Sequence, residues 1–128
     1  MKIVCIPAFN EENTIEDIIK RSFKFADKVI VCDDGSSDST LKKAENSGAI
    51  VLKHEKNFGK GKALKSLFDY VKKLDFDVMI TIDGDGQFLP EEMKFLSEPI
   101  INNQVDIVIG NRFSNSKEMP RYRKTGNM

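Results

Sequence analysis

The sequence predicts an α/β domain with a mostly parallel sheet flanked by helices, and three observations lead to this fold class. Apolar runs of strand length alternate along the chain with segments whose apolar residues recur at helical spacing. The 128 residues suffice to bury one core. Polar or glycine-rich residues follow the apolar runs, and in an open α/β sheet ligands bind at the carboxyl ends of the strands.

Composition excludes several classes of protein. The chain has 20 basic residues (Lys plus Arg) and 20 acidic residues (Asp plus Glu). This balance argues against a nucleic-acid partner, because proteins that bind nucleic acids usually carry an excess of basic residues. Cys5 and Cys32 lie inside apolar runs, which indicates buried, reduced thiols. With His54 as the one histidine, expected at the surface, a zinc site is not predicted. No run has the length of a membrane span or signal peptide, so we expect a cytoplasmic protein.

The first unit is a strand at residues 3–6 followed by a helix. Pro7 ends the strand, Asn10 is expected to cap the helix, and Glu11 and Glu12 suit its first turn. Its buried face is predicted to carry Ile15, Ile18, Ile19 and Phe23.

The second unit has a strand at residues 29–32 that ends in Asp33 and Asp34. Ser37 or Asp38 can cap a short helix that ends near Gly48. Two adjacent acids exceed what a cap requires. They can accept hydrogen bonds from a nucleobase N–H or a ribose hydroxyl, or they can simply solvate a turn.

The third unit has a strand at residues 50–52 and a glycine-rich, lysine-bearing turn at residues 57–62 that opens a helix. Such a turn can offer backbone N–H groups and positive charge to an anion, although a solvated helix start is an alternative. It is not a P-loop, because the Walker spacing is absent. The buried face of the helix is expected to carry Ala63, Leu64, Leu67, Phe68 and Val71.

The fourth strand, residues 78–82, ends in Asp83-Gly84-Asp85-Gly86. Two carboxylates this close repel each other and are most easily kept ionised by a divalent cation. A metal-bound diphosphate is therefore the simplest ligand, and a glycine-rich turn is the alternative. A helix is expected from Pro90, and a fifth strand at residues 105–109.

Basic residues follow the fifth strand. Arg112 is suited to a phosphate or to an ordinary surface pair. Arg121 and Arg123 belong to a basic cluster around Pro120, which can also be a solvated tail.

Five segments together resemble the family 2 glycosyltransferases of the GT-A fold, and within them the polyprenyl-phosphate branch of dolichyl-phosphate mannose and glucose synthases. The segments are residues 7–12 (PAFNEE), 31–40 (VCDDGSSDST), 57–61 (NFGKG), 83–87 (DGDGQ) and 110–113 (GNRF). The resemblance covers nearly the whole chain.

The resemblance implies roles for individual residues. Asp83, Asp85 and Gln87 would hold Mg²⁺ or Mn²⁺, and Asp83, Asp85 and Arg112 would act in catalysis. Arg121 and Arg123 would meet the phosphate of the acceptor. The nucleotide site would comprise Pro7, Ala8, Phe9, Glu11, Asp33 or Asp34, Gly59, Lys60 and Asp83.

The function expected from this resemblance is inverting transfer of a sugar from a UDP- or GDP-sugar to an acceptor, with a polyprenyl phosphate preferred to a glycan hydroxyl. Residues 1–128 would form the nucleotide-sugar-binding domain, and family members continue into an acceptor-binding half. The resemblance implies that the longer protein can associate with the cytoplasmic face of a membrane. The alternatives are a nucleotidyltransferase acting on a sugar phosphate, a phosphorylated signalling module of receiver type, and a non-catalytic nucleotide-sugar-binding domain.

Overall fold

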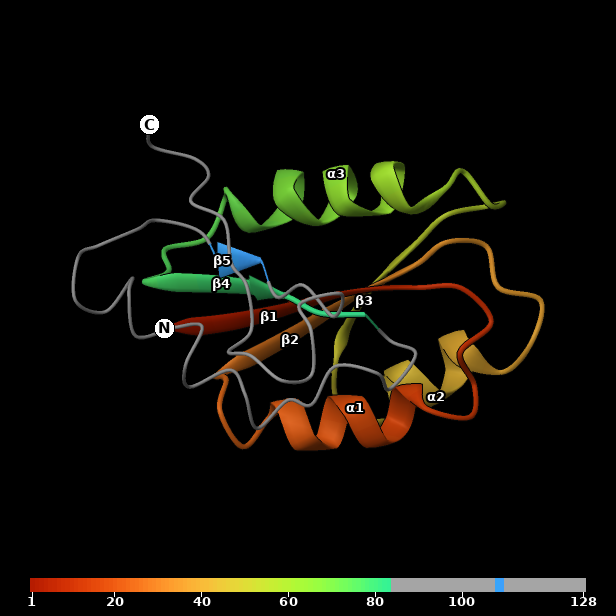
Figure 1. Ribbon diagram of the computed structural model, residues 1–128, viewed down its shortest axis with the longest axis horizontal. Helices are drawn as coiled ribbons and strands as arrows, with labels where there is room; N and C mark the ends of the chain where they lie inside the picture. Colours follow the sequence, from red (N-terminus) through yellow and green to blue (C-terminus); the bar gives the residue numbers. More distant parts are fainter. Residues whose placement is uncertain (84–107, 110–128) are drawn as a thin grey trace, which may run out of the picture.

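The computed structural model describes residues 1–83 and 108–109, which form a five-stranded sheet of order β3-β2-β1-β4-β5 (Figure 1). All four strand pairings in this part of the chain are parallel. The α/β prediction is therefore confirmed. The strands are β1 (Lys2–Ala8), β2 (Lys28–Asp33), β3 (Ile50–Lys53), β4 (Val78–Thr81) and β5 (Val108–Ile109).

Helices cover both faces of the sheet. The helices α1 (Ile15–Ser22) and α2 (Thr40–Asn46) lie on one face, and α3 (Lys60–Val71) lies on the other (Figure 1). The chain adds β2 and β3 on one side of β1 and then returns to place β4 on the other side. The direction of the chain thus reverses between β1 and β4, and in open α/β sheets ligands bind at the carboxyl ends of the strands beside such a switch point.

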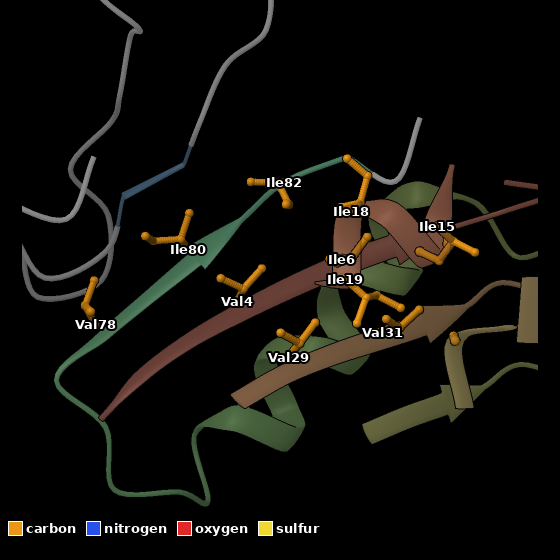
Figure 2. Close-up of a cluster of buried hydrophobic side chains, with 12 residues drawn as sticks. Val4, Ile6, Ile15, Ile18, Ile19, Val29, Val31, Val78, Ile80 and Ile82 are labelled. Carbon is orange, nitrogen blue, oxygen red and sulfur yellow. The ribbon is translucent and has the colours of Figure 1, made fainter. Parts of the chain in front are cut away.

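Alternation along the strands divides the core into two layers. Val4, Val29, Val78 and Ile80 face α1 and α2 and pack with Ile18 and its neighbours (Figure 2). The opposite face of the strands, which includes Ile3, Cys5, Ile30, Cys32 and Met79, packs against α3. The face under α1 and α2 is thus mainly of β-branched residues, whereas the face under α3 also carries cysteine and methionine side chains.

Both cysteines are free and buried, as predicted. Burial raises the pKa of Cys5 to about 12. Burial, and then the charges of Asp34 and Asp33, raise the pKa of Cys32 to about 11. Both thiols are therefore protonated at neutral pH and serve as small apolar side chains.

The predicted start of α1 was wrong. The helix begins at Ile15, and Asn10 takes a left-handed conformation with φ of 53° instead of capping it. Phe23 lies just beyond the helix and is exposed. The N-cap of α2 is Ser39, one residue after the predicted Asp38, although the Asp38 carboxylate accepts the Thr40 N–H at 2.9 Å. The helix expected from Pro90, and residues 105–107 of the fifth strand, lie outside the described residues.

Within residues 1–83 and 108–109, no helix combines the length and apolar character needed to cross a bilayer.

Candidate functional site

The carboxyl ends of β1 and β2 lie level with each other, because Ala8 is paired with Asp33. Asp83 follows β4 on the other side of β1, after Ile82, whose N–H donates to the Cys5 carbonyl at 3.0 Å. The loops after three strands therefore leave the sheet at the same edge. Pro7 and Ala8 end β1, and Phe9 follows with 43% of its surface exposed.

The loops after β1 and β2 are joined by hydrogen bonds. The Asn10 N–H donates to Ser36 Oγ at 2.9 Å, and the Ser37 N–H donates back to Asn10 Oδ1 at 2.9 Å. The Glu11 N–H donates to Thr40 Oγ1 at 2.8 Å. Asn10 does not cap α1 because its side chain links the two loops. The bond to Thr40 of α2 holds the Glu11 backbone close to the loop that carries Asp33 and Asp34.

Asp34 accepts hydrogen bonds from the segment that precedes α3. Its Oδ1 accepts the Phe58 N–H at 2.9 Å and contacts His54 Nδ1 at 2.8 Å, and its Oδ2 accepts the Gly59 N–H at 2.8 Å. Burial alone would raise the pKa of Asp34, but the bonds from His54, Phe58 and Gly59 favour the carboxylate and hold the pKa below its usual value. Asp34 is therefore an ionised, largely buried acceptor at neutral pH.

These bonds correct the interpretation of the glycine-rich turn. The N–H groups of Phe58 and Gly59 face Asp34, so the anion that they bind is a side chain of the protein itself. Gly59 is the N-cap of α3 with φ of +101°, and the helix begins at Lys60, inside the turn predicted over residues 57–62. Positive charge at this turn comes from the exposed side chains of Lys60 and Lys62.

Asp33 differs from its neighbour. It is only 1% exposed, and its Oδ1 has no hydrogen-bond partner within the described part of the chain. A buried oxygen without a donor is unfavourable by roughly 1–3 kcal/mol. Such an oxygen is most simply explained by a donor from a water molecule or ligand.

Asp83 forms an ion pair with Lys60, with Oδ1 and Nζ 2.6 Å apart. The Asp83 side chain is 26% exposed and that of Lys60 is 63% exposed, so this contact lies at the surface of the edge. The pair places the first residue of α3 beside the end of β4.

The described residues supply only part of the predicted metal site. Among residues 1–83 and 108–109, no three carboxylate, imidazole or thiol groups are close enough to hold a metal ion. Asp83 is a partly exposed oxygen ligand of the kind that Mg²⁺ and Mn²⁺ prefer, and it fits such a site. Asp85, Gln87, Arg112, Arg121 and Arg123 lie outside the described residues.

His54 was expected at the surface, and this was wrong. Its side chain is only 14% exposed and lies between Asp34 and Ser66 of α3. Sequence reasoning also missed Asn10, Thr40 and Ser66. One signal could have located His54: it follows β3 directly, and the neighbouring strand in a parallel sheet ends in Asp33 and Asp34.

The parallel sheet of order β3-β2-β1-β4-β5, with helices on both faces, defines an open α/β fold of the Rossmann-like kind. A family model described as glycosyl transferase family 2 matches residues 3–128. The chain belongs to this family, as the sequence motifs indicated.

Two curated relatives illustrate the match. A UDP-N-acetylglucosamine–dolichyl-phosphate N-acetylglucosaminyltransferase from Methanococcus voltae is 33% identical, over 96% of this chain and 57% of that protein. Glycosyltransferase AglJ from Haloferax volcanii is 34% identical, over 97% of this chain and 41% of that protein. The chain thus spans about half the length of these relatives.

Solved structures agree on the fold. Glucosyl-3-phosphoglycerate synthase from Mycobacterium tuberculosis, crystallised with Mn²⁺, UDP and glucosyl-3-phosphoglycerate, is 31% identical. It superposes with a TM-score of 0.63 over 78% of this chain and 39% of that one. The same enzyme was also solved with Mg²⁺ and UDP.

Proposed function

We propose that residues 1–128 form the donor-binding part of an inverting glycosyltransferase that uses a UDP- or GDP-sugar and a polyprenyl-phosphate acceptor. The observation that carries this proposal is the convergence of Asp33, Asp34 and the Asp83–Lys60 pair at one edge of the sheet. Support also comes from the relatives, since one is named for a UDP-sugar and dolichyl phosphate, and another was crystallised with UDP.

The base and ribose would occupy the space bounded by the loops after β1 and β2. Phe9 offers an exposed aromatic ring, and such rings stack on nucleobases. Asp34 Oδ2 accepts one N–H within the described part of the chain, and a carboxylate oxygen can accept a second donor, for which we propose a base N–H. Asp33, whose Oδ1 has no partner among residues 1–83 and 108–109, is the other candidate acceptor, and Pro7, Ala8 and Glu11 would line the approach.

The diphosphate would lie between the Gly59–Lys60 turn and Asp83. Asp83, Asp85 and Gln87 would hold Mg²⁺ or Mn²⁺, which when bound supplies a Lewis acid that neutralises charge on the leaving diphosphate. Lys60 would leave its contact with Asp83 and turn to a phosphate oxygen, which its long exposed side chain permits. Arg112 would add positive charge on the leaving-group side.

The acceptor is proposed from charge. A hydroxyl acceptor requires a general base, whereas a phosphate oxygen is already anionic at neutral pH. Arg121 and Arg123 would bind that phosphate. A polyprenyl-phosphate acceptor would also place the enzyme at the cytoplasmic face of a membrane.

Membership of the family argues against the nucleotidyltransferase and receiver-type alternatives, and no feature of the site favours either. The test below also distinguishes the third alternative, a domain that binds the nucleotide sugar without transferring the sugar.

The test is a transfer assay with this protein. Dolichyl phosphate would be incubated with labelled UDP-N-acetylglucosamine, UDP-glucose or GDP-mannose and Mn²⁺, and the lipid product extracted. We expect labelled lipid from one donor, with an inverted anomeric configuration by NMR, and its loss in Asp83→Asn but not in the surface control Lys20→Ala. No transfer from any donor despite nucleotide binding would favour the non-catalytic domain.

A further inference from the structure

His54 lies at the centre of a chain of polar contacts that joins β2, β3 and α3. Its backbone N–H donates to the Asp33 carbonyl at 2.9 Å. Its ring places Nδ1 2.8 Å from Asp34 Oδ1 and Nε2 2.8 Å from Ser66 Oγ. The rings of Phe58 and His54 pack edge to face with their centroids 5.4 Å apart, and this contact covers the imidazole further.

The chemistry of the neighbours selects the proton positions on the ring. The Asp34 carboxylate is an acceptor only, so Nδ1 must carry a hydrogen. In the neutral ring Nε2 is then an acceptor, which the Ser66 hydroxyl satisfies as a donor. Cys32 Sγ lies 3.6 Å from Nε2 and completes its surroundings.

The contact order serine–histidine–aspartate is also that of a nucleophilic triad, but the surroundings do not suit that chemistry. Ser66 lies in the middle of α3, where backbone N–H groups are used within the helix. No group of donors is therefore available there to stabilise an oxyanion. The contacts instead point toward Asp34.

We infer that His54, oriented by Ser66, is a positioning residue that fixes the Asp34 carboxylate for the nucleotide. With Oδ1 occupied by His54 and Phe58, Oδ2 holds the Gly59 N–H and is the oxygen that would accept a base N–H. The same carboxylate holds the turn from which Lys60 reaches Asp83. His54 thereby links the base end of the site to its phosphate end, and this role rests on the proposed function.

The first arm of the test needs no variant and no nucleotide. Because the chain has a single histidine, a long-range ¹H–¹⁵N NMR spectrum reports on His54 without assignment. We expect a proton on Nδ1 at neutral pH, and its loss or exchange in Asp34→Asn. An imidazole with a bare Nδ1 and a proton on Nε2 would overturn the inference, whether or not the chain binds nucleotides.

The second arm compares two amides. In His54→Asn the amide nitrogen replaces Nδ1 and can still donate to Asp34, whereas in His54→Gln it replaces Nε2 and cannot. Titration of each variant with UDP and GDP in the presence of Mn²⁺ should show affinity within about threefold of the parent for Asn, and a loss of about tenfold for Gln. Both should melt within a few degrees of each other.

Equal nucleotide affinities of His54→Asn and His54→Gln would contradict the positioning role. If the variant that loses affinity also loses melting temperature to the same degree, His54 has only a structural role. If the parent chain bound neither nucleotide, the proposed function and the role for the nucleotide that rests on it would both fail, whereas the NMR arm would still show whether His54 donates to Asp34.

Discussion

Asp34 and Asp83 lie at the same edge of one sheet, yet their surroundings differ. Asp34 has a side chain 5% exposed and accepts two backbone N–H groups and a histidine N–H. Asp83 is 26% exposed and contacts a lysine that is 63% exposed. Backbone donors cannot leave without unfolding a loop, whereas a lysine side chain can. The first carboxylate is therefore part of the architecture, and the second is placed to exchange partners.

The largest effect should come from Asp34→Ala. This change leaves the Phe58 and Gly59 N–H groups and His54 without their acceptor, and we expect a loss of about 3–4 kcal/mol in the free energy of unfolding. The matched variant Asp83→Ala should lose less than about 1 kcal/mol, as is usual for exposed ion pairs. Urea denaturation measures both, and equal losses would remove the contrast between the two acids.

Gly35→Ala should disturb the same Asp34 network through the backbone of the segment that precedes α3. Gly35 has φ of +75°, and an added Cβ would lie 2.3 Å from the Lys56 carbonyl carbon. Strain and displacement of the segment before α3 should together reduce the free energy of unfolding by about 2–4 kcal/mol. Gly61→Ala is the control, because its Cβ meets nothing within 4 Å and alanine favours helices. A neutral Gly35→Ala would show that the close approach is not maintained in solution.

Acid should weaken the Asp34 network in a defined direction. The folded-state pKa of Asp34 is below the ordinary value, so its contribution to stability is fully present above about pH 4 and is lost as the pH falls through the folded pKa. The Asp34→Asn variant should be less stable than the parent at pH 6, and its stability should decline less steeply than that of the parent as the pH falls below 4. Thermal melting at a series of pH values gives both, and parallel curves for the two proteins would contradict the assignment.

The smallest effect on stability belongs to Lys60→Ala. Its pair with Asp83 is exposed, so the free energy of unfolding should change by less than about 1 kcal/mol. Nucleotide affinity in Mn²⁺ should nevertheless fall by about tenfold, because a phosphate contact is lost. Lys65→Ala, one turn further along α3 and paired with Asp69, is the control. Equal affinities for the two variants would remove Lys60 from the donor site.

Strands and buried helix faces could be predicted because hydrophobic periodicity is local. Ile15, Ile18 and Ile19, and likewise Ala63, Leu67 and Val71, are buried as the spacing indicated. The start of α1 could not be predicted, because Asn10 has its partner 27 residues away in Ser37. His54 was misplaced for the same reason: its partners Asp34 and Ser66 come from other elements.

The glycine-rich turn shows a different kind of failure. Its composition suits an anion, but composition does not say which one, and the structure supplies Asp34. The roles proposed for Asp85, Gln87, Arg112, Arg121 and Arg123 stay predictions from the resemblance, since these residues lie outside the described part of the chain.

The most direct test of the central claim is calorimetric titration of this chain with UDP and with GDP, each in Mn²⁺ and in EDTA. We predict that one nucleotide binds in Mn²⁺, that EDTA weakens this binding strongly, and that Asp83→Asn abolishes the dependence on metal. Binding of neither nucleotide, or binding that is equal in Mn²⁺ and EDTA and unchanged in Asp83→Asn, would contradict a metal-dependent donor site at the end of β4.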